Sequence, residues 1–258
     1  MSAIAHQPSR SITAQAPAPA RTVGLWSAVL ATVFALAYDL AQIAEWLGWL
    51  GSAGGPESAS TPFGLAMLLT PSLLLGSAFL MLMVGLHAVT PADRRVWSHG
   101  AVAFATVYAV LISGVYFVQL ALVAPRLASG RIAGIEPFVF VPFDSYLYAM
   151  DILGYSFMSV STLLAARTLR GDGVERVARV LLTANGLLVP FLLFQMFVHQ
   201  LIWVAALWAV TFPGATWALA VWFRRMPEEA SLSARSWCSP AGTRNGSAAS
   251  ARRSGRVG

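Results

Sequence analysis

Six long apolar stretches, separated by short loops that hold most of the arginines, constrain this chain more than any other feature. A hydrocarbon layer about 30 Å thick needs about 20 apolar residues for each helical crossing. Of the 258 residues, 57% are hydrophobic and only 11% are charged, whereas an ordinary soluble domain has roughly 25% charged residues. We therefore predict an all-α, polytopic integral membrane protein whose single membrane domain is a bundle of six transmembrane helices.

The predicted transmembrane domain covers residues 23–225. Its spans are expected at residues 23–50, 63–89, 96–124, 146–169, 177–198 and 201–223. The last two spans form one continuous apolar stretch, about twice the length of a single membrane helix, so the chain must fold back within it. We place this hairpin at the adjacent polar pair His199 and Gln200, and we expect kinks at Pro190 and Pro213.

The two ends of the chain differ in composition from the spans. Residues 1–22 and 226–258 are rich in Ala, Ser, Pro, Gly and Arg, a composition that cannot bury enough apolar surface to fold, so we predict a disordered lead and a disordered basic tail. The triplet from Ala35 to Ala37 resembles a signal-peptidase site. The apolar sequence continues past it to Leu50, so we expect an uncleaved first span.

Arginine placement predicts the orientation. All seventeen basic side chains are arginine, which together with abundant alanine is typical of a high-GC bacterial genome. With a cytoplasmic N-terminus, fifteen arginines fall in cytoplasmic segments and only Arg126 and Arg131 fall outside, as the positive-inside rule requires. We expect a bacterial cytoplasmic (inner) membrane protein with both termini in the cytoplasm.

Several functions are disfavoured. The net charge of +6 comes from arginines in short loops rather than on one accessible face, so nucleic-acid binding is not expected. His87 and His99 are interpreted as polar groups near the membrane surface rather than haem ligands. The chain has no lysine for a phosphate-binding loop and no H-E-x-x-H or G-x-S-x-G sequence. We predict no cofactor, no metal site and no catalytic residue; the expected partners are the lipid bilayer and a small-molecule or ion substrate.

Polar side chains within the spans gather in the predicted extracytoplasmic half. Asp39, Gln42 and Glu45 follow one another at three-residue steps, within about 120° on a helix. Span 146–169 has a polar stripe at helical spacing that includes Tyr148 and Asp151. An isolated charge in hydrocarbon costs about 2.5–3.5 kcal/mol, so these groups must face one another, water or a ligand. The candidate cavity residues are Asp39, Gln42, Glu45, Tyr116, Gln119, Tyr148, Asp151, Gln195 and His199.

Three function classes stay open at this stage. The first is a small transporter or ion-coupled permease with an outward-facing acidic cavity, with residues 134–143 as a lid over it or as packing on the bundle. The second is a structural or accessory membrane protein whose polar residues only hold helices together. The third is an intramembrane enzyme. A void lined by Asp39, Gln119 and Asp151 would favour the first class, and direct pairs without a void would favour the second.

Overall fold

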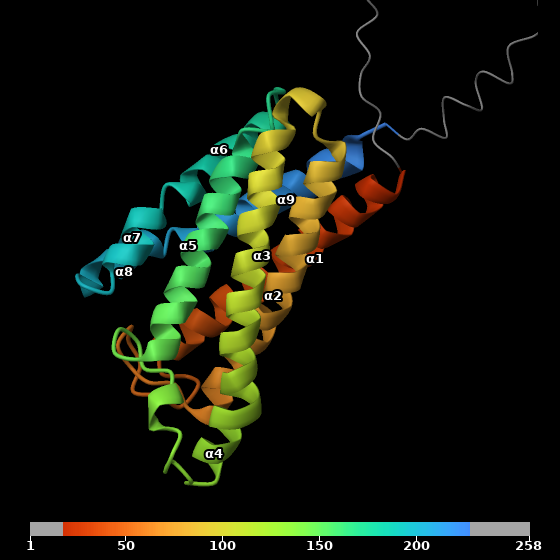
Figure 1. Cartoon of the computed structure of the whole chain (residues 1–258). Coiled ribbons are helices and arrows are strands. Elements are labelled where there is room, and N and C mark those ends of the chain that lie inside the picture. Colours follow the sequence, from red (N-terminus) through yellow and green to blue (C-terminus); the bar gives the residue numbers. More distant parts are fainter. Residues whose placement is uncertain (1–17, 228–258) are drawn as a thin grey trace, which may run out of the picture.

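The computed structural model of this chain describes residues 18–227, and most of the predicted lead and tail lies outside this range (Figure 1). Within it, all regular secondary structure is helical. Six segments are long and apolar enough to cross a membrane. The prediction of an all-helical chain with six membrane-length segments is therefore confirmed for residues 18–227.

Three of the six segments are single helices, and the other three are made of two or more helical pieces. In chain order they are α1 (Ala18–Trp46); α2 (Pro62–Val89); α3 (Arg95–Val118) continued by the π-helix η2 (Gln119–Val123) and α4 (Ala124–Ala128); α5 (Tyr146–Ala166); α6 (Val174–Gly186) with α7 (Val189–Phe194); and α8 (Ile202–Ala205) with α9 (Trp208–Arg225). Short 3-10 turns, η1 (Ala92–Arg94), η3 (Glu136–Phe138) and η4 (His199–Leu201), lie in the connections.

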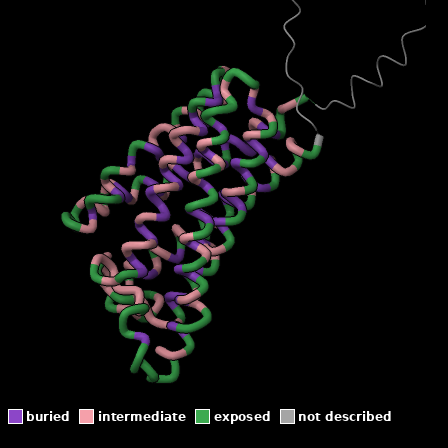
Figure 2. The backbone as a smooth tube through the Cα atoms, viewed as in Figure 1, coloured by how far each residue is buried: buried purple, intermediate pink, exposed green. Residues whose placement is uncertain are grey.

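The long helices form a closed ring. Each of α1, α2, α3, α5, α6 and α9 packs on the helix before and the helix after it in this order, and α9 packs back on α1 (Figure 1). Helices that are adjacent in sequence are thus adjacent in space. Buried residues follow the interior of the ring along its length, and exposed residues lie on its outside (Figure 2).

The ring has two distinct ends. At one end the Arg21 side chain donates hydrogen bonds to the carbonyl oxygens of Phe223 and Arg224, at 3.1 and 3.0 Å, which ties the start of α1 to the end of α9. Arg94 donates to the carbonyl of Thr168 at the same end. We call this the arginine end. The opposite end, called the loop end, holds residues 47–61 and 129–145 and the turn after α7.

Near the arginine end, α1 and α2 approach each other through glycine. A Cβ atom at Gly85 would lie 2.8 Å from the Cα of Gly24 and 2.9 Å from its nitrogen. No side chain fits between the two backbones at this point. Such close approaches through small residues are a common way for membrane helices to gain van der Waals contact.

The predicted hairpin and Pro190 lie at or next to interruptions of the helices, whereas Pro213 lies inside a helix. The chain turns between α7 and α8 around η4, which contains His199 and Gln200. The interruption between α6 and α7 directly precedes Pro190. Pro213 lies inside helix α9, which is continuous around it, and the kink expected there stays a prediction. The interruption between α8 and α9 falls earlier, at Ala206 and Leu207. It precedes the carbonyl group, four residues before Pro213, that the proline cannot bond because it has no N–H.

Segment boundaries also shift by a few residues. The first helix begins at Ala18, before the expected start at residue 23, and ends at Trp46, before the expected end at residue 50. Gly48 has a φ of 74° and Gly51 a φ of 88°, a backbone conformation that glycine adopts at little cost and that ends a helix. The early end of α1 brings Glu45 close to the loop that follows.

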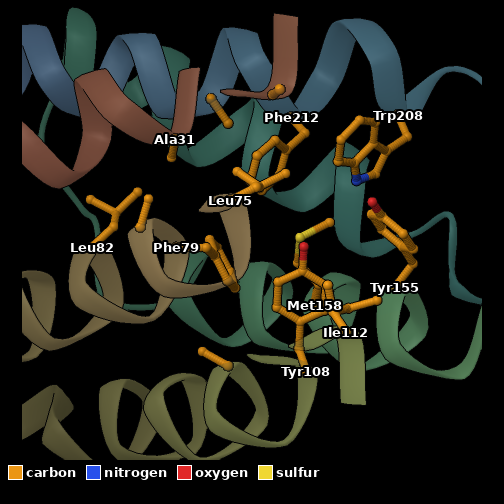
Figure 3. Close-up of a cluster of buried hydrophobic side chains, with 14 of the residues drawn as sticks. Ala31, Leu75, Phe79, Leu82, Tyr108, Ile112, Tyr155, Met158, Trp208 and Phe212 are labelled. Carbon is orange, nitrogen blue, oxygen red and sulfur yellow. The ribbon is translucent and has the colours of Figure 1, made fainter. Parts of the chain in front are cut away.

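Five aromatic rings cross the middle of the bundle and contact one another in a closed cycle (Figure 3). They are Phe79, Tyr108, Tyr155, Trp208 and Phe212, with centroid separations of 5.0 to 5.7 Å between neighbours. The rings come from α2, α3, α5 and α9. All are buried. We call this layer the aromatic floor, because the cavity described next lies on its loop-end side.

Candidate functional site: an acidic cavity at the loop end

A cavity of about 210 Å³ lies between the loop end and the aromatic floor. Helices α1, α2, α5, α7, α8 and α9 contribute to its lining, together with the end of α3 and the loop before α2. Seven of the nine predicted site residues line it: Asp39, Gln42, Glu45, Tyr116, Tyr148, Asp151 and Gln195. We call this space the acidic cavity.

Helix α1 supplies two of the three carboxylates. Glu45 is only 3% exposed, and neither of its carboxylate oxygens has a hydrogen-bond partner within the described residues. Asp39 is half-buried, and its Oδ2 is likewise buried without a partner. A Cβ at Gly64 would lie 2.7 Å from Glu45 Oε2, so the carboxylate packs on the first turn of α2, where the positive end of the helix dipole favours a negative charge.

The third carboxylate comes from α5. Ser145 caps this helix by accepting a hydrogen bond from the Tyr148 amide at 3.2 Å. The helical spacing then directs Tyr148, Asp151 and Tyr155 to the cavity side. Asp151 Oδ1 accepts a hydrogen bond of 2.6 Å from the Tyr116 hydroxyl of α3. One oxygen of Asp151 is therefore engaged in a direct interhelical pair.

Aromatic side chains make up one wall of the cavity. Trp208 stands edge-on to both Tyr38 and Tyr155, with ring centroids 5.9 and 5.4 Å apart. The Trp208 indole nitrogen is turned toward the Tyr155 hydroxyl (Figure 3), yet it has no hydrogen-bond partner within the described range. Trp208 is 6% exposed. Tyr155 and Trp208 thus belong to both the cavity wall and the aromatic floor.

Two predicted site residues lie elsewhere. Gln119 is fully buried and does not line the cavity, because its amide donates to the carbonyl of Phe138 in the turn η3. His199 lies at the surface instead, where its ring stacks on Phe143 at 4.1 Å and its Nδ1 is 3.4 Å from a carboxylate oxygen of Glu57. Neither residue is part of the cavity lining, because residues of the loops after α1 and α4 contact them instead.

The segment before α5 covers part of the cavity. Phe140 and Pro142 line it, and the rings of Phe140 and Phe143 both pack against Tyr148, at 5.4 and 5.3 Å. Phe143 has a φ of 63°, which is uncommon for a residue other than glycine. The contacts of Phe143 with His199 and Tyr148 therefore connect three loop-end segments at one point.

The cavity has no cationic lining. Among residues 18–227, no arginine or histidine lines it. The salt bridges within these residues involve Asp93 and Glu57 rather than the cavity carboxylates. The described part of the chain also has no group of three His, Cys, Asp or Glu side chains that could hold a metal ion. The cavity therefore gathers three carboxyl groups with no basic side chain of residues 18–227 in its lining.

Sequence reasoning missed three cavity residues, namely Tyr38, Tyr155 and Trp208. Tyr155 lies four residues after Asp151, on the same helical stripe. Tyr38 was detectable, because Tyr38, Gln42 and Glu45 are spaced by four and three residues, the same pattern that revealed the stripe on α5. Trp208 carried no such signal, since the interruption before α9 sets its direction.

The geometry of the cavity, rather than a likeness to a known protein, is the basis for the functional proposal. No family model, curated protein or solved structure gives a significant match to the chain.

Proposed function

We propose that this protein spans a bacterial cytoplasmic membrane with six helices and that its arginine end lies in the cytoplasm. Nine of the described arginines belong to segments at that end, whereas only Arg126 and Arg131 lie on the loop-end side. This asymmetry supports the orientation through the positive-inside rule. Large exposed apolar side chains recur along the outer faces of the helices, for example Leu40, Val110 and Val210, as contact with lipid requires.

We further propose that the acidic cavity receives a small solute from the extracytoplasmic side, as in a small transporter or ion-coupled permease. The observation that supports this most is Glu45, a carboxylate buried beside a cavity without any partner among the described residues. Burying an unpaired charge is costly. Glu45 borders open space rather than a packed neighbour, so a carboxylate without a partner among residues 18–227 favours a ligand.

A purely structural role is the second candidate, and one observation favours it for one residue. The hydrogen bond between Tyr116 and Asp151 joins α3 to α5 directly, as expected for interhelical packing. Comparable bonds occur away from the cavity, for instance between Thr32 and Thr216 at 2.8 Å. Asp39 and Glu45 have no such bond within the described residues, so this role does not account for them.

Reporter fusions test the orientation. Fusions after Arg95 and after Arg170 should report a cytoplasmic location, and a fusion after Gly55 should report an external one. A reversed result at any of the three positions would contradict the proposed topology.

Cysteine labelling tests whether the cavity is open to the outside. In a Cys238→Ser background, cysteine is introduced at Ala206, which lines the cavity, at Ala59 in the exposed loop, and at Ala31 in the buried core. A membrane-impermeant thiol reagent added to spheroplasts should label Ala59→Cys and Ala206→Cys but not Ala31→Cys. Protection of Ala206→Cys, with Ala59→Cys labelled, would refute an outward-open cavity.

Transport itself is measured in proteoliposomes with a mixture of small solutes followed by mass spectrometry. Wild-type protein should move at least one solute, and an Asp39→Asn, Asp151→Asn double variant should move none while remaining folded. Equal solute movement by both proteins would leave the carboxylates without a role in transport.

A further inference from the structure

We propose that the acidic cavity selects a small organic cation, meaning an alkylamine or quaternary ammonium compound with a compact apolar body. This inference rests on the proposed solute-binding function and specifies its ligand class. It combines three properties of the cavity: its charge, its aromatic wall and its size.

The carboxyl groups of the lining favour a positive ligand. Asp39, Glu45 and Asp151 come from two helices, and within residues 18–227 no basic side chain lines the cavity to balance them. Glu45 is 3% exposed with both carboxylate oxygens unpartnered. An anionic ligand would add like charge, and a neutral ligand would leave the buried carboxylates uncompensated. A cation supplies the missing counter-charge.

The aromatic wall suits an organic cation rather than a bare ion. Tyr38, Tyr155 and Trp208 line the cavity and contact one another, with Trp208 edge-on to the other two rings. Electron-rich rings attract ammonium groups, and Trp is the strongest of them. Leu68, Leu69 and Ile152 add apolar lining, which favours alkyl groups on the ligand over a hydrated inorganic ion.

The cavity dimensions limit the size of the ligand. About 210 Å³ corresponds to roughly seven water volumes and lies below the range of about 300–1,000 Å³ that holds drug-sized molecules. The carboxylates are also dispersed, since no three metal-ligating side chains group together in the described residues. Dispersed acids around an aromatic wall fit a cation whose charge is spread over methyl or methylene groups.

Binding is tested with two probes of the same shape. Choline carries a quaternary ammonium group, and 3,3-dimethylbutan-1-ol replaces its nitrogen with carbon and is neutral. The full-length protein in lipid nanodiscs is titrated with each probe at constant ionic strength, by calorimetry and by tryptophan fluorescence, which Trp46 and Trp208 in the cavity lining should report. Choline should bind at least tenfold more tightly than the neutral alcohol. Equal affinities would overturn the proposal, because the cavity would then recognise apolar shape alone.

Variants locate the binding. Asp39→Asn and Glu45→Gln should each weaken choline binding by at least tenfold, whereas Asp93→Asn, the same change at an exposed position of the arginine end, should not alter it. Removal of a ring by Trp208→Leu should weaken binding by about 30-fold, the effect of a desolvated cation–π contact. Tyr38→Leu is a second ring variant outside the aromatic floor, in case Trp208→Leu unfolds. Unchanged affinity in the folded acid variants would contradict the proposed site.

The two proposals fail in different ways. If the thiol reagent labels Ala206→Cys but choline does not bind, the cavity is open and the organic-cation inference is wrong. If Ala206→Cys is protected and choline does not bind, the outward-open cavity is wrong and the inference fails with it.

Discussion

Two glutamates at opposite ends of the bundle differ in how the protein accommodates their charge. At the arginine end, Glu175 accepts hydrogen bonds from the amides of Arg170 and Gly171, at 2.7 and 2.8 Å, and from the Trp222 indole at 3.2 Å. At the loop end, Glu45 is more deeply buried and has no partner among the described residues. Glu175 closes a connection between helices, whereas Glu45 borders a cavity. The carboxylate with fewer partners is therefore the one for which we propose a ligand.

The same contrast extends to the surroundings of these residues. Away from the cavity, polar side chains of neighbouring helices pair with one another: Asn185 donates to Thr162 and accepts from Thr211, each at 3.1 Å. Backbones also touch there, at Gly24 and Gly85. On the cavity side, Asp39 Oδ2, both Glu45 oxygens and the Trp208 nitrogen are unpartnered within residues 18–227. Within the same range, single unpartnered hydroxyl groups also occur away from the cavity, at Ser72 and Ser159, but the unpartnered carboxylate oxygens lie on the cavity side.

The largest effect is expected where the aromatic floor separates these two regions. Phe79→Ala removes a fully buried ring that contacts Tyr108 and Phe212. The loss should be about 3–5 kcal/mol in the free energy of unfolding, as for other buried aromatic truncations. Thermal unfolding of purified protein in nanodiscs measures it. Phe63→Ala, at an exposed position of α2, is the control and should change stability little. A small effect at Phe79 would show that the floor is loosely packed.

Tyr116→Phe tests the direct pair between Tyr116 and Asp151 on the cavity side. It removes the hydroxyl that donates to Asp151, and hydrogen bonds to charged groups contribute about 1.5–3 kcal/mol. The melting temperature should fall, whereas Tyr146→Phe, at an exposed position on the same side, should leave it unchanged. An unchanged melting temperature in Tyr116→Phe would mean that Asp151 is satisfied by water from the cavity.

Gly85→Ala tests the close packing near the arginine end. The added Cβ would meet the Gly24 backbone, and overpacking of this kind costs about 1–3 kcal/mol. Gly114→Ala is the matched control, since a Cβ at Gly114 meets nothing within 4 Å and alanine should stabilise the helix by about 0.5–1 kcal/mol. If both variants unfold at the same temperature, the contact between α1 and α2 is not tight.

The smallest change in stability is expected at Glu45 itself. Glu45→Gln keeps the shape and replaces a carboxyl group that has no partner among residues 18–227, so the free energy of unfolding should stay the same or rise. Glu175→Gln removes a carboxylate with three hydrogen bonds and should cost about 1 kcal/mol. Chemical unfolding of both variants beside the wild type gives the comparison. A loss at Glu45 as large as that at Glu175 would indicate a structural rather than a ligand-binding carboxylate.

Much of the site was predictable because helical periodicity is local. The spacing of Tyr148, Asp151 and Tyr155 places them on one side of a helix whatever the helix packs against, and Asp39 and Glu45 follow the same rule on α1. Depth followed from the orientation and the rise per residue. Helical spacing and depth together predicted that residues of α1, α5 and the segment of α7 would lie at the same level.

The contributions of the loops could not be predicted in this way. Gln119 and His199 were predicted at the depth of the cavity, but Gln119 bonds the carbonyl of Phe138 and His199 stacks on the ring of Phe143. Those partners lie in the irregular segment between α4 and α5, where no periodicity fixes direction. Trp208 likewise depends on the interruption between α8 and α9. Its place in the wall follows from tertiary packing rather than from its position in the sequence.

The sequence by itself determined the six apolar segments, their order and the helix faces that hold the acids, because segment length, charge placement and helical spacing are properties of short stretches of chain. Only the tertiary structure decided that the helices close into a ring, that five aromatic rings meet in its middle and that Glu45 has no partner among residues 18–227. Closure and pairing depend on residues far apart in the chain meeting at a few ångströms, a distance that sequence spacing does not encode.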